Sequence, residues 1–251
     1  MNGRPPEIQS LLECGCGKPT LDGVAILLAP RLSEWAASPQ FATKILSEVG
    51  KRRRPELAEL ILTCMSEGRV EVNVFHFSAV ISASEKAGAW TSALHFLREM
   101  THAAVTPNEF SYSAAISAFE KGGQWEGALG LLTEMQLDRL CPNEVTYGAS
   151  ISACARGSNW ISALELLSGL QVALLQVNVV TISAALTACE KASRWQPAMS
   201  LLELMARKKI NADRISFSSA ISTCEKCGNW ELAVGMFRAM RLDLHHPDAV
   251  S

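Results

Sequence analysis

The chain has 251 residues, of which 48% are hydrophobic and 19% are charged, and its formal net charge is −2. No apolar run approaches the roughly 18 residues needed to cross a bilayer, which argues against a membrane-spanning protein. A pI near 6.2 argues against indiscriminate binding to nucleic acid, although it leaves room for a local basic stripe. Ala, Leu and Ser dominate the composition, and this favours helices over strands.

Residues 1–37 match no later segment of the chain. Their acidic residues fit poorly with an organelle transit peptide, which should be poor in acids. We interpret the segment either as a partly ordered leader or as the remnant of a degenerate repeat, and we identify no clear transit peptide in it.

From residue 38 onward the sequence repeats every 35 residues. Five tryptophans mark the period without an insertion or deletion: Trp90, Trp125, Trp160, Trp195 and Trp230. A fixed period of this length is the signature of stacked supersecondary units. We divide the array into six units, at residues 38–71, 72–106, 107–141, 142–176, 177–211 and 212–246. Residues 247–251 resemble the opening of a further unit, so we expect the sequence to be a fragment of a longer protein.

Each unit has the pattern of two helices. In the unit 107–141, the spacing of apolar residues predicts a first helix over Glu109–Lys121 and a second helix that starts near Trp125. In the first unit the expected helices are Phe41–Gly50 and Pro55–Ser66. We therefore predict an all-α fold, a right-handed α-α superhelix (solenoid) of stacked helical hairpins.

Two columns of the repeat are expected to form the core. A small column lets paired helices approach closely, and a larger column fills the space between layers. The small column is Ala93, Ala128, Ala163, Ala198 and Ala233, and the larger one is Leu97, Leu132, Leu167, Leu202 and Phe237.

The cysteines also follow the repeat. Cys154, Cys189 and Cys224 share a column with Ser84 and Phe119, which indicates buried, reduced thiols rather than a disulfide framework. The two closely spaced pairs, Cys14 with Cys16 and Cys224 with Cys227, lie at opposite ends of an elongated array. We therefore expect no shared metal site and no cofactor.

One column places a cation in every unit of a chain whose overall charge is near zero. It consists of Lys51, Lys86, Lys121, Arg156, Lys191 and Lys226. Such a line suits a regularly spaced polyanion, and we predict that it contacts phosphates. The alternative is a solvated helix end, where a cation offsets the helix dipole. The acids beside this column are expected to point to a different face; they are Glu85, Glu120, Glu190 and Glu225.

The unit resembles the pentatricopeptide repeat. The resemblance rests on the period, the Asn-Glu-Val-Thr-Tyr of residues 143–147, the Cys-Glu-Lys of residues 189–191 and the Ala-Leu-Glu-Leu-Leu of residues 163–167, and it covers about residues 38–251. The tetratricopeptide repeat has a similar fold, but its period is about 34 and its Trp lies early in the first helix. The resemblance implies binding of single-stranded RNA, with one nucleotide per repeat.

The resemblance also implies that two side chains per repeat select the base. They are a residue early in the first helix and the residue just before the next first helix. The pairs are Thr43 with Asn73, Ser78 with Asn108, Ser113 with Asn143, Gly148 with Asn178, Ser183 with Asp213 and Ser218 with Asp248. A short hydroxyl leaves room for a purine. An Asn amide can donate to and accept from adenine, whereas an Asp carboxylate only accepts, which suits guanine.

The expected preference from the 5′ end is A-A-A-(purine)-G-G. The fourth base is the least defined, because Gly148 has no side chain. In the family a further column sandwiches each base between neighbouring repeats, and it lies on the same helical face as the hydroxyls. Here that column is Phe75, Phe110, Val145, Val180 and Ile215.

Each of these columns has an alternative explanation. The Asn and Asp residues stand where a helix N-cap belongs. The serines suit close packing between helices. An apolar stripe such as the predicted stacking column is commonly part of the core.

The sequence contains no recognised catalytic motif. The chain has no Walker loop, nucleophile elbow, dinucleotide fingerprint or deaminase signature, so we expect no catalytic residue and no enzyme activity. The resemblance implies an RNA-binding adaptor in organelle RNA processing, stability or editing, in a mitochondrion or a chloroplast or other plastid. We expect a monomer that binds single-stranded RNA and protein partners and no membrane. A scaffold that holds peptides in the same groove is the alternative.

Overall fold

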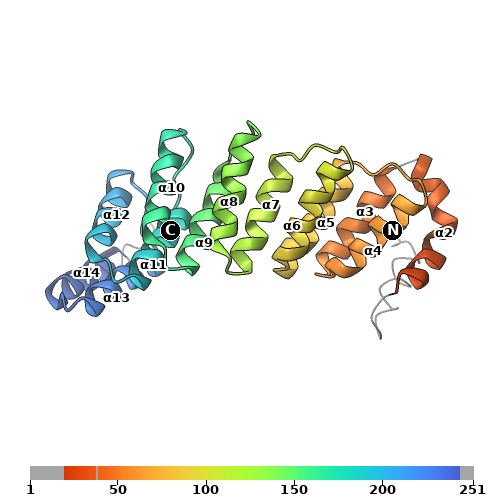
Figure 1. Cartoon of the computed structure of the whole chain (residues 1–251). Coiled ribbons are helices and arrows are strands. Elements are labelled where there is room, and N and C mark those ends of the chain that lie inside the picture. Colours follow the sequence, from red (N-terminus) through yellow and green to blue (C-terminus); the bar gives the residue numbers. More distant parts are fainter. Residues whose placement is uncertain (1–19, 38, 244–251) are drawn as a thin grey trace, which may run out of the picture. The chain divides into compact units, whose positions relative to one another are not determined.

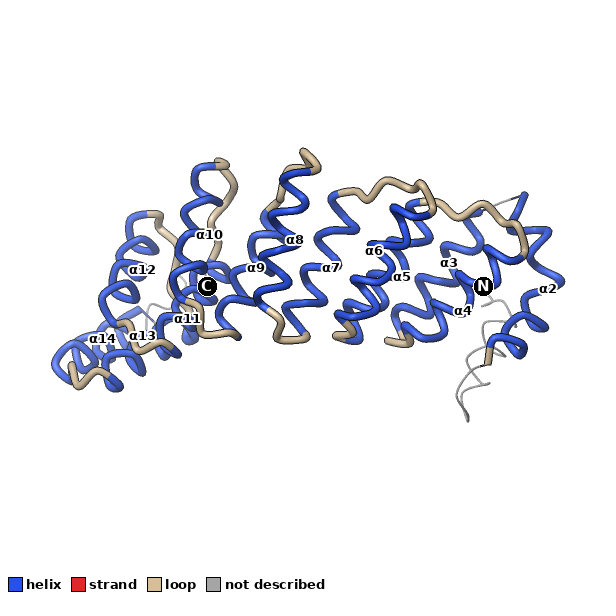
Figure 2. The backbone as a smooth tube through the Cα atoms, in the orientation of Figure 1, coloured by secondary structure: helices blue, strands red, loops and turns tan. Residues whose placement is uncertain are grey.

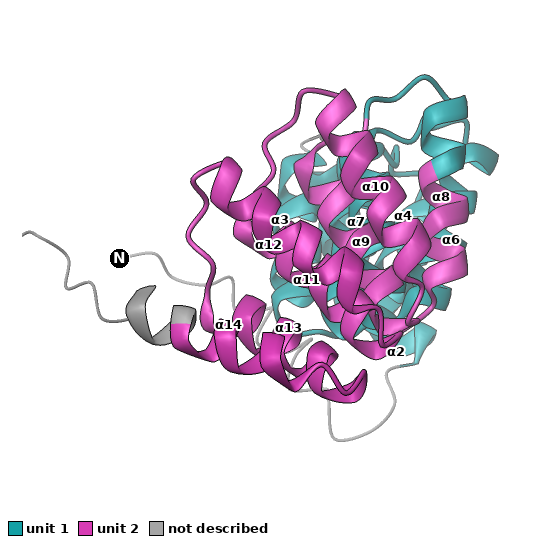
Figure 3. Cartoon of the chain, turned by 90° about the vertical axis from the view of Figure 1, so that its left-hand side faces the viewer, with its two compact units in different colours: residues 1–122, 133–141 teal, residues 123–132, 142–251 magenta. Residues whose placement is uncertain are grey.

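The structure is a computed structural model that describes residues 20–37 and 39–243. Within these residues it contains thirteen helices and no strand (Figure 2). The chain divides into two compact units, unit 1 and unit 2, which are larger than the 35-residue repeats described above. Figure 3 shows them in different colours. Unit 1 comprises residues up to 122 together with 133–141, and unit 2 comprises residues 123–132 together with those from 142 onward.

Successive helices pair into hairpins (Figure 1). Unit 1 contains α2 (Leu21–Ala37), α3 (Pro39–Lys51), α4 (Pro55–Glu67), α5 (Val74–Ala87), α6 (Trp90–His102) and α7 (Glu109–Lys121). Unit 2 contains α9 (Glu144–Arg156), α10 (Trp160–Val172), α11 (Val179–Lys191), α12 (Trp195–Arg207), α13 (Arg214–Lys226) and α14 (Trp230–Asp243). Helix α8 (Trp125–Leu137) contributes residues to both units. From α3 onward, odd numbers are the first helices of hairpins and even numbers are the second helices.

Within each compact unit the hairpins stack because a first helix packs against the first helix of the next hairpin. In unit 1, α5 packs against α3, against α7 and against its own partner α6. In unit 2, α11 packs in the same way against α9, α13 and α12. The predicted all-helical architecture of stacked hairpins is confirmed. Helix α2 lies against α4 and α3 with Val24, Leu28 and Trp35 buried, while residues 1–19 of the expected leader or degenerate repeat lie outside the described residues.

The helix boundaries agree with those expected from the apolar spacing. The helix predicted over Glu109–Lys121 is α7 itself, and α8 begins at Trp125. In the first hairpin, α3 and α4 extend by one or two residues beyond the predicted Phe41–Gly50 and Pro55–Ser66. The repeat period therefore locates the helices to within one or two residues.

The two expected core columns are buried up to Ala198, whereas Leu202 on α12 and Ala233 on α14 are half-buried. The alanines of the small column up to Ala198 and the leucines of the larger column up to Leu167 are at most 5% exposed. The prediction is wrong for Phe237, which is 54% exposed. Among the described residues α13 is the one helix that packs extensively against α14, so the outward side of α14 lies open.

Left-handed backbone residues end the helices with the same 35-residue period. After the first helices they are Arg53, Gly88, Gly123, Ser158, Ser193 and Gly228, with φ between 53° and 74°. After the second helices they are Arg69, Ala104, Arg139, Leu174 and Lys209, with φ between 55° and 58°. This conformation turns the next N–H back onto the helix, as where Asn159 N donates to Cys154 O at 2.9 Å. The backbone thus repeats even where the residue type does not.

The tryptophan at the start of a second helix lies over the end of the next first helix. In unit 1 a Cβ added to Gly122, which caps α7, would lie 2.4 Å from Trp90 Cδ1. In unit 2 a Cβ added to Gly157, which caps α9, would lie 2.0 Å from Trp125 Cδ1. Later repeats have Ala192 or another side chain at this point, so there the indole must lie in a different position.

Gly157→Ala should therefore lower stability, because the added methyl displaces the Trp125 indole from a packed site. We expect the free energy of unfolding to fall by about 1–3 kcal/mol. Gly130→Ala is the matched control: Gly130 lies inside α8 with no atom within 4 Å of an added Cβ. Helix propensity should make that variant more stable by about 0.5–1 kcal/mol. Urea unfolding followed by circular dichroism measures both, and equal shifts of the same sign would contradict this packing.

Candidate nucleic-acid interface

The Asn and Asp side chains predicted to select bases are the N-caps of the first helices. Asn73, Asn108, Asn143, Asn178 and Asp213 precede α5, α7, α9, α11 and α13. Each side-chain oxygen accepts the backbone N–H of the third helical residue, at 2.8 to 3.2 Å. The capping explanation is confirmed, whereas the reading role stays a prediction. Asp248 lies outside the described residues.

In Asn108 and Asp213, one side-chain atom accepts the capping hydrogen bonds and the other polar atom makes none with the described residues. Asn108 Oδ1 accepts the backbone N–H and the hydroxyl of Ser111, both at 2.9 Å. Asp213 Oδ1 accepts the same two groups of Ser216, at 2.8 and 2.6 Å. Within the described part of the chain no hydrogen bond occupies Nδ2 of Asn108 or Oδ2 of Asp213. The remaining atom is a donor in Asn and an acceptor in Asp, so the two residue types offer opposite polarity to a ligand.

Two serines of the predicted pairs, Ser78 and Ser183, lie at the junction between neighbouring first helices of one unit. Ser78, Ser113 and Ser183 are 7% to 8% exposed, so only an edge of each reaches solvent. Ser78 Oγ lies 3.0 Å from Ser111 Oγ, and Ser183 Oγ lies 2.9 Å from Ser216 Oγ. These contacts support the packing explanation for the serines. The other members of the column are Thr43 and Gly148, which are half-buried, and Ser218, which is exposed.

The apolar column predicted to stack on bases is exposed. Its members are Phe75 (66%), Phe110 (58%), Val145 (65%), Val180 (64%) and Ile215 (60%). Each is the second residue of its first helix and so lies next to a capping side chain. Burial would stabilise a side chain of this size by about 1.5–3 kcal/mol. The interpretation of this column as core is therefore wrong, and so regular an exposed apolar column indicates a binding surface.

In unit 1 the predicted residue types meet in one hollow of about 340 Å³, between α3, α5 and the start of α7. Its volume is at the lower end of those of small-ligand sites. The other lining residues have small side chains, which leaves space within the hollow; they are Ser47, Gly50, Ala79 and Ser82. Six of the ten lining residues are predicted site residues: Thr43, Phe75, Ser78, Lys86, Asn108 and Phe110.

The basic column lies in the last turns of the first helices. Its members, Lys51, Lys86, Lys121, Arg156, Lys191 and Lys226, are all exposed. Their position fits the helix-dipole explanation as well as a role at phosphates. Contact with phosphate stays a prediction.

The glutamates beside this column do not all point away from it, and the expectation is wrong for Glu85 and Glu190. Lys121 Nζ lies 2.8 Å from Glu85 Oε1 in unit 1, and Lys226 Nζ lies 3.2 Å from Glu190 Oε1 in unit 2. Stacking brings each lysine beside the preceding first helix, so its partner is 36 residues earlier. These pairs are partly exposed and stabilise by at most about 1 kcal/mol each, so a phosphate can compete for the lysines.

Comparison with known sequences matches three models of one family. The pentatricopeptide repeat-containing protein model matches residues 41–111, the PPR repeat model matches residues 110–140 and 215–243, and the pentatricopeptide repeat domain model matches residues 165–227. Together these matches cover most of the chain. The chain belongs to the pentatricopeptide repeat (PPR) family. No curated protein sequence matches it.

Solved PPR structures share the fold. PPR10 in complex with an 18-nt psaJ RNA element superposes with a TM-score of 0.74 over 98% of this chain, at 20% identity. PPR10 from maize gives a TM-score of 0.67 over 96% of the chain, at 18% identity. The PPR domain of Arabidopsis thaliana protein-only RNase P 1, in complex with tRNA, gives 0.61 over 75% of this chain and 95% of its own length, at 14% identity. This chain spans 35% to 38% of the length of PPR10.

The described cysteines of this PPR chain are free thiols. Cys154, Cys189 and Cys224 are completely buried, and burial raises the pKa of the Cys154 and Cys189 thiols to about 11. They are thus structural, as predicted. Residues 20–37 and 39–243 contain no cluster of three or more His, Cys, Asp or Glu that could hold a metal. Over the same ranges no helix combines the length and apolar character of a membrane span.

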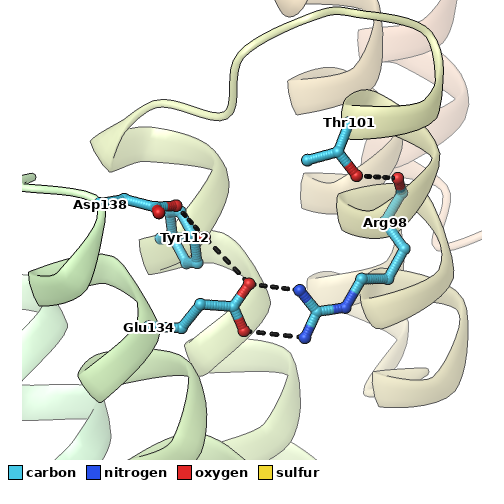
Figure 4. A network of polar contacts seen from close by, with 5 residues as sticks. All are labelled: Arg98, Thr101, Tyr112, Glu134 and Asp138. Atoms are coloured by element: carbon cyan, nitrogen blue, oxygen red, sulfur yellow. Dashed lines mark hydrogen bonds and ion pairs between the residues drawn. The ribbon is translucent and has the colours of Figure 1, made fainter.

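A buried tyrosine of unit 1 joins the hairpins in a way that the repeat columns do not show (Figure 4). Tyr112 Oη donates to Asp138 Oδ2 at 2.6 Å and lies 3.2 Å from Glu134 Oε1, and Arg98 binds both oxygens of Glu134. Burial and these carboxylates raise the pKa of Tyr112, while Arg98 lowers the pKa of Glu134. The one signal in the sequence is a phenolic hydroxyl in a column that has Phe77 one repeat earlier.

The reading candidate Asp213 is held as a carboxylate. Its partial burial opposes ionisation, but hydrogen bonds from the hydroxyl and backbone N–H of Ser216 and from Ser183 outweigh that effect. The pKa of Asp213 is therefore lower than the ordinary value for an aspartate. At neutral pH its free oxygen is an acceptor only.

Lowering the pH should destabilise the parent protein more than it destabilises the Asp213→Asn variant. A lowered folded-state pKa contributes stability that is present above the unfolded pKa, near about 3.9, and is lost as pH falls through the folded pKa. Asn caps a helix as well as Asp but does not titrate. Thermal unfolding between about pH 6 and about pH 2 should show the parent losing Tm relative to the variant below about pH 4. A Tm difference that is independent of pH would contradict these hydrogen bonds.

Proposed function

We propose that this PPR chain binds single-stranded RNA sequence-selectively and contacts one nucleotide with each repeat. The observation that carries the proposal is the hollow of unit 1, which gathers all three predicted residue types. Two phenylalanines from consecutive repeats, Phe75 and Phe110, line it together with the polar pair Ser78 and Asn108 and the cation Lys86. Exposed rings beside hydrogen-bonding groups and a cation are the components of a single-strand binding site.

The dimensions of α5 suit a nucleotide. Lys86 lies eight residues beyond Ser78 on α5, which is about 12 Å at 1.5 Å per residue. A base edge at the start of the helix and a phosphate nearer its end can therefore contact the same helix, because the lysine side chain reaches back along it. Base–aromatic stacking contributes about 1–3 kcal/mol per base, which makes the exposed rings the main source of affinity.

The capping geometry gives the base preference a defined chemistry. The free Nδ2 of Asn108 can donate to the N1 acceptor of adenine, and the free Oδ2 of Asp213 can accept from the N1–H and N2–H₂ of guanine. The same difference between Asn and Asp, followed along the array, gives the preference A-A-A-(purine)-G-G. Asn178 alone defines the fourth base, because its partner is Gly148.

The similar structures support RNA as the partner, since both PPR10 and the PPR domain of the RNase P protein are seen in RNA complexes. For the wider setting we propose organelle RNA processing, stability or editing, in a mitochondrion or plastid. In that setting the chain itself supplies binding and selection rather than catalysis.

Lys86→Ala should weaken binding to all RNA sequences alike and flatten the salt dependence. Each phosphate contact adds about −0.7 to the slope of log K against log salt for single strands, so six contacts give a slope no steeper than about −4. Lys208→Ala is the control, because it removes an exposed cation at the end of the second helix α12. Fluorescence anisotropy with a labelled A-rich RNA at several KCl concentrations gives the slopes. An unchanged slope for Lys86→Ala would place this lysine outside the interface.

Asp213→Asn should move the fifth base preference from guanine toward adenine. A good base contact discriminates by about 1–3 kcal/mol, so the preference should change about tenfold or more. The measurement is competition between A-A-A-A-G-G and A-A-A-A-A-G at neutral pH, where both proteins are capped and folded. If parent and variant rank the two RNAs identically while both bind, the assignment of Asp213 to the fifth base is wrong.

Titration with a pool of labelled single-stranded RNA separates RNA binding from the scaffold alternative. Saturable binding that unlabelled single strands displace supports the proposal. Failure of the folded chain to bind any RNA would overturn it, and would instead leave the exposed apolar column as a surface for a peptide.

A further inference from the structure

A third side chain lies between the two members of a predicted reading pair in unit 2. Ser216 Oγ lies 2.9 Å from Ser183 Oγ and 2.6 Å from Asp213 Oδ1. Ser216 is completely buried, so its hydroxyl can reach no ligand itself. Its contacts connect a residue of α11 with the cap of α13, the helix that follows in the stack.

The same arrangement recurs in unit 1. Ser111 Oγ lies 3.0 Å from Ser78 Oγ and 2.9 Å from Asn108 Oδ1, and Ser111 is also completely buried. Two separate units thus place a buried hydroxyl between the two predicted reading side chains.

In unit 2, the number of hydroxyl hydrogens decides which of these oxygens donates and which accepts. The carboxylate of Asp213 can only accept, so the single hydrogen of the Ser216 hydroxyl points to it. Ser216 Oγ then faces Ser183 as an acceptor. The hydroxyl hydrogen of Ser183 goes to Ser216 Oγ, to Val179 O at 2.7 Å or to Asp213 Oδ1 at 3.4 Å. In each case Ser183 has only lone pairs left for a ligand.

The same count of hydroxyl hydrogens applies in unit 1, where the cap is Asn108 instead of an aspartate. Asn108 Oδ1 accepts the backbone N–H of Ser111, which identifies that atom as the oxygen, so the Ser111 hydroxyl also donates to it. Ser78 therefore offers lone pairs, as Ser183 does. The outward-facing atom of Asn108 is the donor Nδ2, where Asp213 has the acceptor Oδ2.

One repeat of unit 2 provides an internal comparison. Where the first reading position is Gly148, the residue in the bridging position is Thr181. Its hydroxyl turns instead to the backbone oxygen of Asn178, at 2.9 Å, and Asn178 Oδ1 accepts the Thr181 backbone N–H. The bridge is thus present beside Ser78 and Ser183 and absent beside Gly148.

We propose that Ser111 and Ser216 are positioning residues for base selection, which hold the paired serine as an acceptor and turn the free atom of the Asn or Asp outward. This inference rests on the proposed RNA-binding function and deepens it. The pair of Ser183 and Asp213 then offers two acceptors, which match the N1–H and N2–H₂ donors of guanine. The pair of Ser78 and Asn108 offers one acceptor and one donor, which match the N6–H₂ and N1 of adenine.

The test is base competition at the fifth position with Ser216→Ala, Ser216→Thr and the control Thr187→Val. The Ala variant keeps the backbone N–H that caps α13, and circular dichroism checks that it is folded. Because the hydrogen bond that orients the Asp213 carboxylate is lost, the preference for guanine over adenine should fall about three- to tenfold. Preferences at the other bases should not change.

The two remaining variants separate positioning from general packing. Ser216→Thr keeps a hydroxyl that can donate to Asp213, as Thr146 Oγ1 does to Asn143 Oδ1 at 3.0 Å, and should restore the parent preference. Thr187 lies on α11 and donates to the backbone of Ser183, so Thr187→Val removes a neighbouring hydroxyl without touching Asp213. It should leave the preference unchanged.

An NMR titration of the Asp213 carboxyl in the free protein gives a readout that needs no RNA. Ser216→Ala should raise the pKa of Asp213, and Ser216→Thr should return it to the parent value. If Asp213→Asn changes the fifth base preference while Ser216→Ala does not, the positioning role is wrong and the proposed function stands. If Asp213→Asn leaves the ranking unchanged, or no RNA binds, the proposed function fails and this inference fails with it.

Discussion

The hydrogen bond from the third backbone N–H of each described first helix, from α5 to α13, to an Asn or Asp oxygen is the constraint on which the candidate surface depends. It ends the preceding loop, starts the helix and fixes the rotamer of the capping side chain. Replacing such a cap by Ala costs about 0.5–2 kcal/mol, so stability alone restricts this column to a few short polar residues. Each of these residues has a second polar atom, and the helix start holds that atom in a repeated orientation. A column maintained for folding can thus present an ordered row of hydrogen-bonding groups.

Other features of the surface follow from the same helix start. The second residue of each first helix faces outward beside the cap, and from α5 to α13 it is apolar and more than half exposed. A column of exposed apolar side chains loses the stabilisation that burial would give, and nothing in the stacking of the hairpins requires it. The cations stand at the other end of the same helices, where the dipole favours them. Each first helix from α5 to α13 therefore has an apolar and polar start and a cationic end, which is the arrangement that the proposed contacts to a base and a phosphate require.

The sequence alone predicts the elements of this fold well, because the period, the turn residues and the apolar spacing all act within one repeat. Glu109–Lys121 could be assigned as a helix from its own residues. What it cannot predict are contacts between repeats. Glu85 adjoins Lys86 in the sequence but pairs with Lys121, since the stacking of two first helices decides which charges meet. The bridge through Ser216 has the same origin, because its partner Ser183 is 33 residues away.

The choice between Asn and Asp in the capping column has no explanation in folding. Both residues cap equally well, so capping explains why the column is Asn or Asp and leaves open which of the two occurs. The described array has Asn at four caps and then Asp213. In both types one oxygen receives the helix N–H, and the difference lies only in the atom that faces outward, Nδ2 or Oδ2. Because either side chain accepts the same helix N–H, the variation bears chiefly on what lies outside the helix. A ligand edge that distinguishes donors from acceptors, as a nucleobase does, is the kind of partner to which such a difference matters.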